Sequence, residues 1–459
     1  MNKYARRILF SNLGGWWPAI ATVTVVTALV GLCTTQFAWT RDERFVTEVQ
    51  AQGHAITEFT IVAETIYLLV AALAVFSLTV VGTATVDSTR RTFAQWRLVG
   101  ATPSDVRRGI WALVATAACL GALPGSLIAI AASYPVIPVF NQLAAPGFDT
   151  PVLPPSPLAW ITSLVLGVAT CMLGAFGPAR RASTARPIEV FRALPVHRRR
   201  RWWWRVPLAV LALLCSVGML AVAIVSADPA AGVAVMFNLA LNAGMWAVLF
   251  IYLIGPLAIP GILAGLGRLA RGSATGRLAA KAAVERVHAS ANTIAPLAAG
   301  IGGAGAILVS VESSAAVIRT FDDSAEANLS DTLVMTALAS LILLTTSAAV
   351  VALAARDRER EHSLLRIAGM SSRDITTWHV YQSFFLAVTA TVLALAPVAV
   401  TTATTAAASA AYTGHPIIVV PKTALAVGFI LSWSVLFLVQ WSPARRLLRA
   451  DIAVGLRAT

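Results

Sequence analysis

Few residues of this 459-residue sequence have the types and spacing that chemistry requires. The segment 300–305, Gly-Ile-Gly-Gly-Ala-Gly, has the spacing of a dinucleotide-binding loop. It lies inside an apolar stretch with no preceding strand, so we interpret it as a site of close helix packing. No G-x-x-x-x-G-K-[ST] segment is present, which predicts that this chain does not hydrolyse ATP itself. No combination of residues indicates a catalytic centre, a bound cofactor or a metal site.

Glu64, Asn238 and Asn242 are polar residues within apolar segments, where a polar group needs a partner, and we consider them as possible contact sites. Glu64 faces a substrate or a partner helix, or else lies near the outer membrane surface and reaches water. Asn238 and Asn242 are four residues apart, on one face of a helix. They either form hydrogen bonds to a neighbouring helix or contact a polar substrate. We interpret the four cysteines, which all lie in apolar segments without metal or disulfide spacing, as packing residues.

A basic segment occurs twice, at 90–105 and at 359–374, with a constant offset of 269 residues. Each copy predicts a short helix that ends at a glycine, Gly100 or Gly369, because glycine adopts the left-handed conformation after a helix at low cost. A second helix is predicted to follow directly. We call these two helix-turn-helix segments the first corner (90–105) and the second corner (359–374).

The residues after each glycine have the spacing of a capping box: Thr102 with Asp105, and Ser371 with Asp374. Each corner also carries an apolar stripe and an arginine. These residues are Phe93, Trp96, Arg97, Leu98 and Val99 in the first corner, and Leu364, Leu365, Arg366 and Ile367 in the second. If the corners project into the cytoplasm, the membrane cannot cover the stripes, and we expect a protein partner to bury them. The alternative is that both corners are topology signals whose glycines only turn the chain.

The composition predicts a membrane protein with several spans. Hydrophobic residues make up 58% of the chain and charged residues 12%, and the mean hydropathy is +0.76. Ten segments are long enough to cross about 30 Å of hydrocarbon. The predicted spans are 16–37, 60–82, 109–133, 157–176, 206–226, 233–256, 292–312, 331–355, 377–404 and 421–440.

The basic residues predict the orientation. With the N-terminus in the cytoplasm, 31 of the 35 lysine and arginine residues fall in segments on the inner side. Both termini are therefore predicted to be cytoplasmic. A net charge of +14 suggests nucleic-acid binding in a soluble chain, but here it is spread over every inner segment, so the predicted partner is the lipid bilayer and not nucleic acid.

The repeat extends beyond the corners. Pro178-Ala179-Arg180-Arg181 matches Pro443-Ala444-Arg445-Arg446 at an offset of 265. The fold class is thus an all-α polytopic membrane protein, with two parallel four-helix halves and a two-helix linker, and no large extracytoplasmic domain. We predict five segments: 1–59, an interfacial helix, the first span and a short stalk; 60–195, the first three-span unit; 196–275, the linker pair; 276–330, an interfacial helix, the seventh span and a stalk; and 331–459, the second three-span unit. The proline-rich stretch 134–157 is predicted to be irregular.

On these motifs the sequence resembles the FtsX-like permease family of ABC transporters, including MacB-type and Bce-type exporters. The resemblance rests on the arginine-rich corners and on the closing Pro-Ala-Arg-Arg segments. It implies a bacterial cytoplasmic membrane protein whose corners dock on a cytoplasmic ATPase dimer, and ATP and Mg²⁺ bound by that ATPase. The MacB and Bce types carry a substantial extracytoplasmic domain, which this chain lacks.

The resemblance implies a permease that exports or extracts an amphipathic compound, such as an antimicrobial peptide, a lipid or a hydrophobic drug, with resistance as one outcome. The alternative is a mechanotransmission subunit that moves no substrate and regulates an extracytoplasmic or membrane partner. An ATP-independent carrier is disfavoured, because such carriers have inverted repeats and charges at mid-depth, whereas the two halves of this chain are parallel.

Overall fold

The computed structural model describes residues 13–449, apart from positions 55, 146, 152, 155, 286 and 368 and the segments 185–204, 226–232, 270–273, 322–329 and 356–364. The described residues are helical with short connections and contain no strand. By their contacts they divide into two compact units. The first unit comprises Met1–His197 and Ala348–Asp357, and the second comprises Arg198–Ser347 and Arg358–Thr459.

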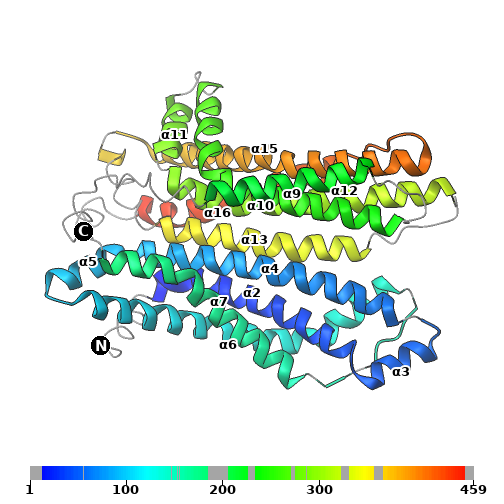
Figure 1. Ribbon diagram of the computed structural model, residues 1–459. Helices are drawn as coiled ribbons and strands as arrows, with labels where there is room; N and C mark the ends of the chain where they lie inside the picture. Colours follow the sequence, from blue (N-terminus) through cyan, green and yellow to red (C-terminus); the bar gives the residue numbers. More distant parts are fainter. Residues whose placement is uncertain are drawn as a thin grey trace. The chain divides into compact units, whose positions relative to one another are not determined.

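In the residues that the structure describes, the first unit contains α2 (Leu13–Trp39), α3 (Glu43–Ala51), α4 (Ile56–Ser88), α5 (Arg90–Leu98), α6 (Pro103–Ala144) and α7 (Pro157–Thr184) (Figure 1). Helix α2 packs against α4, α6 and α7. The short helices α3 and α5 lie at opposite ends of the unit.

The second unit holds α9 (Arg205–Val225), α10 (Val233–Leu269), α11 (Ala274–Glu285), α12 (Val287–Phe321), α13 (Ser330–Ala355), α15 (Ser372–Thr413) and α16 (Lys422–Arg449); the last turns of α13 are counted with the first unit. Helix α12 packs against α15 and α16 as α2 packs against α6 and α7. The contacts between these helices therefore follow the repeat in the sequence. The predicted linker pair, α9 and α10, packs on α15 within this unit.

Eight helices of the described part of the chain are long and apolar enough to cross a membrane: α2, α6, α7, α9, α10, α12, α15 and α16. In α4 and α13 the apolar stretches that can be described are shorter, at Leu73–Val86 and Ser340–Leu353. The chain is thus a multi-pass membrane protein. Its division into ten spans and five segments remains a prediction.

Small residues allow the close packing predicted for segment 300–305. A Cβ atom on Gly302 would lie 2.6 Å from Pro397 Cγ, and one on Gly305 would lie 2.6 Å from Val398 Cγ2. The glycines therefore allow α12 to approach α15 closely, and the interpretation of this segment as a site of close helix packing is confirmed.

The prediction that 134–157 is irregular is wrong for its first part. Helix α6 continues to Ala144 and includes Pro124, Pro135 and Pro138. Each proline removes one backbone hydrogen bond, a loss that long apolar helices tolerate when neighbouring elements support them. Helix α10 likewise continues through Pro256 and Pro260.

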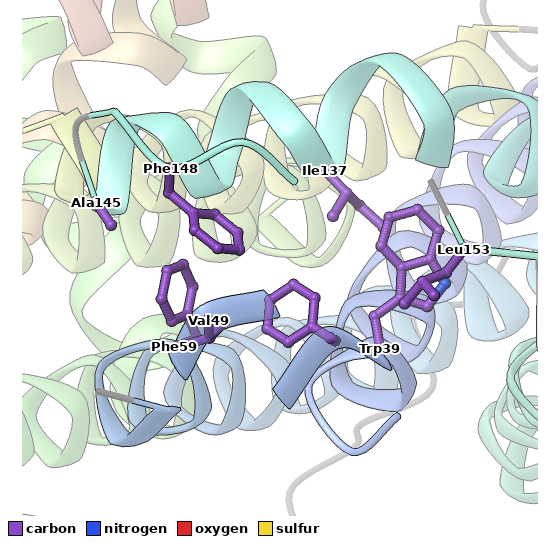
Figure 2. Packing of buried hydrophobic residues seen from close by; sticks show 8 residues of the cluster. Trp39, Val49, Phe59, Ile137, Ala145, Phe148 and Leu153 are labelled. Carbon is purple, nitrogen blue, oxygen red and sulfur yellow. The ribbon is translucent and has the colours of Figure 1, made fainter. Parts of the chain in front are cut away.

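A small aromatic core closes the end of the first unit that lies opposite α5. The phenyl rings of Phe45 on α3, Phe59 on α4 and Phe148 in the segment after α6 meet at centroid distances of 4.8 to 5.7 Å, and Phe59 and Phe148 point toward each other in Figure 2. Gln52 and Asp149 exchange two hydrogen bonds of 2.9 and 3.0 Å beside it. The short stalk predicted within segment 1–59 therefore includes a separate helix, α3, that packs on this core.

Candidate functional site

The first corner ends its short helix α5 with a complete Schellman motif. The amide of Gly100 donates to the carbonyl of Arg97 at 3.2 Å, and the amide of Ala101 donates to the carbonyl of Trp96 at 3.0 Å. Gly100 has a φ of 98°, in the left-handed region. The two carbonyls at the helix end, which have no partner within the helix, are satisfied by this turn.

The second corner repeats this turn. The amide of Gly369 donates to the carbonyl of Arg366, and the amide of Met370 donates to the carbonyl of Leu365, both at 3.0 Å. Gly369 has a φ of 91°. Leu364 and most of the preceding segment lie outside the described residues. The predicted left-handed conformation of both glycines is confirmed.

Both corners then start a long helix with a capping box. In the first, the Thr102 hydroxyl donates to Asp105 Oδ2 at 2.6 Å and the Thr102 amide donates to the same oxygen at 3.3 Å. In the second, Ser371 makes the equivalent bonds to Asp374 at 2.6 and 3.1 Å. The predicted capping boxes are thus confirmed.

These hydrogen bonds also change the acidity of the two carboxyl groups, which precede the predicted spans 109–133 and 377–404. The hydroxyl of Thr102 lowers the pKa of Asp105, and the hydroxyl of Ser371 lowers the pKa of Asp374, because both hydrogen bonds favour the charged form. Both carboxylates are therefore ionised at neutral pH and suited to the positive end of the helix dipole.

Helix α5 is held to the first unit by two aromatic residues. Phe93 is only 2% exposed, and its ring meets that of Trp96 edge to face at 5.5 Å. Trp96 covers Gly109 of α6, where an added Cβ would lie 2.7 Å from Trp96 Cζ3. This corrects the expectation for Phe93: its own chain buries this side chain, so no partner protein is needed to cover it.

Arg97 ties α5 to a third helix. Its Nη1 donates to the carbonyl of Ser183 at the C-terminal end of α7, at 3.3 Å. A cation at this position also interacts favourably with the negative end of the helix dipole. Arg97 was predicted to contact an ATPase, and the structure gives it a contact within the chain as well.

The most exposed apolar residues of the corners directly precede the glycines. Leu98 is 64% exposed and Val99 90% exposed, and Ile367, which aligns with Leu98 at the offset of 269, is 58% exposed. All three residues belong to the apolar stripes predicted from the sequence. The signal that singles them out is an apolar residue two positions before the glycine in both copies.

The three polar residues predicted within the spans lie on two helices, α4 and α10. Glu64 lies on α4, and its side chain is outside the described residues. Asn238 and Asn242 are exposed on α10, and the Asn242 amide donates to the backbone carbonyl of Asn238 at 2.8 Å. The side chain of Asn242 therefore forms a hydrogen bond within its own helix.

Comparison with protein-family models gives a match to the FtsX-like permease C-terminal domain at residues 64–187 and again at 332–452. The two matches cover more than half of the chain, and each contains one corner. No curated protein sequence matches this chain significantly.

Proposed function

This chain belongs to the FtsX-like permease family, and on that premise we propose that it is the permease subunit of an ABC transporter. In this proposal a separate cytoplasmic ATPase dimer binds ATP and Mg²⁺, and the permease exports or extracts an amphipathic compound from a bacterial cytoplasmic membrane. Both corners and both termini face the cytoplasm, as the basic residues predict.

The observation that carries the proposal is the structural identity of the two corners. Each has the same Schellman turn, the same capping box and an exposed branched apolar residue, Leu98 or Ile367, before its glycine. A topology signal needs only positive charge and has no requirement for this shared geometry. Two equivalent docking points in one chain suit one permease with two ATPase subunits.

The docking hypothesis predicts that charge at the exposed apolar positions breaks the complex. Burying each such side chain contributes about 1.5 to 3 kcal/mol before ordering costs. We therefore expect the double variant Leu98→Asp with Ile367→Asp to lose a co-expressed ABC ATPase during affinity purification from membranes.

Ile418→Asp is the matched control. This residue is 67% exposed in the connection between α15 and α16, remote in sequence from both corners, and its replacement makes the same chemical change. The control should keep the ATPase. Retention of the ATPase by the double variant, inserted at normal levels, would leave the corners with a topological role only.

The second candidate function is a transmitter that moves an extracytoplasmic or membrane partner without transport. The ordered aromatic core around Phe45, Phe59 and Phe148 favours it, because packed elements transmit displacement. Reconstituted vesicles separate the two: a transporter depletes a labelled amphiphile from one leaflet in an ATP-dependent manner, and a transmitter hydrolyses ATP without moving it.

A further inference from the structure

The second unit contains a cavity of about 430 Å³ between three helices. It is lined by residues within 297–312 of α12, 337–344 of α13 and 423–432 of α16. These three helices are labelled in Figure 1. The lining is mostly aliphatic, and among the described residues that form it Glu312 is the one with an ionisable side chain. This volume is within the usual range of small-molecule sites.

Glu312 is half-buried on an apolar helix. Within the part of the chain that the structure describes, no hydrogen bond or ion pair is found for its carboxylate. An ionisable group at such a position is costly unless it has a partner or reaches water. Lys422 adjoins the lining residue Thr423 but is exposed and does not line the cavity. The carboxylate is therefore available to a cationic ligand.

The position of Glu312 gives the cavity a polar end and an apolar end. Leu297 and Glu312 are fifteen residues apart on α12, which is about 22 Å along a helix. Residue 312 is also the predicted outer end of the seventh span. A molecule with its head at Glu312 and its chain toward Leu297 would have the orientation of a lipid in the outer leaflet.

The cavity opens to the side of the unit. Val427 and Leu431 of α16 both line it and are 54% and 49% exposed. Aliphatic residues at an opening suit the entry of an acyl or alkyl chain directly from the bilayer, because a chain in the bilayer carries no water that must be removed.

The first unit packs its equivalent helices closely. A Cβ on Gly82 of α4 would lie 2.8 Å from the Cys171 carbonyl of α7, and one on Gly174 would overlap Thr79. At the offsets of the repeats, 269 and 265, these glycines align with Val351 and Val439. Valine has no room in such a contact, so α16 cannot repeat at Val439 the close approach that α7 makes at Gly174.

We propose that this cavity binds a single-chain amphipathic cation, whose ammonium or guanidinium group pairs with Glu312 and whose apolar chain lies between α12, α13 and α16. The proposal rests on the proposed function, since it names the substrate class of that transporter. Charge complementarity selects this occupant: an anionic head is repelled by Glu312, and a neutral head leaves the carboxylate without a partner.

The charge requirement is tested by binding to the purified full chain in nanodiscs, without an ATPase. The probes are a dansyl-labelled alkyltrimethylammonium and a dansyl-labelled alkyl alcohol of the same chain length. Glu312→Gln should weaken binding of the cation roughly tenfold and leave the alcohol unchanged. Glu285→Gln removes an exposed carboxylate that pairs with Lys281 on α11, and it should change neither affinity. Unchanged binding of the cation to Glu312→Gln would overturn the proposal.

The location is tested by filling the cavity. Ala424→Phe places a ring in the lining and should weaken both probes, whereas Ala426→Phe, at an exposed position of α16 outside the lining, should weaken neither. Equal binding to both variants would place the ligand elsewhere. Because no ATPase takes part, a failure of the corners to dock an ATPase leaves these results intact, and loss of the cavity leaves the docking result intact.

Discussion

Gly100 and Gly369 differ from the other glycines near the corners in what their replacement would cost. Their φ values of 98° and 91° are in the region that residues with a Cβ rarely adopt. A Cβ at either position would meet nothing within 4 Å. Any effect of alanine there would therefore come from the backbone alone and would not report a lost or new contact.

Gly100→Ala and Gly369→Ala should each strain their corner by about 1 to 2 kcal/mol. The amides of Ala101 and Met370, which close the two turns, should then exchange with deuterium roughly 5- to 30-fold faster. Gly218→Ala is the control, because a Cβ there also meets nothing within 4 Å but the residue lies inside α9. That variant should be neutral or slightly stabilising. Unchanged exchange at both corner amides would show that the turns are not under this constraint.

At the scale of elements, α5 is a short helix with only nine residues and no N-terminal side-chain cap. Such a helix is marginal on its own, so its stability depends on packing. The contacts of Phe93 and Trp96 with the unit and the bond from Arg97 to α7 provide that packing. Helix α5 is therefore linked directly to both α6 and α7.

Phe93→Ala should release α5 from the unit, because removing a buried phenyl ring costs roughly 3 kcal/mol. Limited trypsin digestion should then cut faster after Arg90, Arg91 and Arg97 while the chain remains inserted. Leu98→Ala, on the exposed side of the same helix, should leave the cleavage rate unchanged. Equal rates for both variants would indicate that Phe93 does not anchor α5.

At the scale of the whole molecule, the proposed function requires that both corners face the cytoplasm, and the aromatic core of the first unit is then expected on the other side of the membrane. The distribution of basic residues predicts this arrangement. Four exposed positions in the described residues test it without interference from burial: Thr47 and Asp149 beside the aromatic core, and Ser104 and Ser372 at the corners.

Single cysteines at these positions, in a chain whose four native cysteines are replaced by alanine, should divide into two groups in intact cells. An impermeant maleimide should label Thr47→Cys and Asp149→Cys, and should label Ser104→Cys and Ser372→Cys only after the membrane is opened. Labelling of either corner from outside would reverse the orientation and remove the basis for ATPase docking.

The proposed function also predicts the number of ATPase subunits that bind one permease chain. The purified chain alone should hydrolyse no ATP, since the sequence contains no P-loop. Activity should appear with two ATPase subunits per permease, measured by phosphate release and by the mass of the complex. Sustained turnover by the isolated chain would contradict this assignment.

The sequence alone determined the features that depend on residues a few positions apart. The pairs Thr102 with Asp105 and Ser371 with Asp374 predicted the capping boxes, because these hydrogen bonds close within one helical turn. The glycine before each box predicted the left-handed turn for the same reason. The apolar composition and the repeat indicated a multi-pass helical protein of a permease family, which the family match confirms.

Only the tertiary structure decided which corner residues are buried, which are exposed, and where the second unit has a cavity. Phe93 and Leu98 are both apolar residues of α5, and the packing of α5 on the unit makes one buried and the other exposed. The cavity beside Glu312 needs residues from 297–312, 337–344 and 423–432 to come together. Local patterns carry no information about such contacts, because they arise from the packing of helices that are distant in the chain.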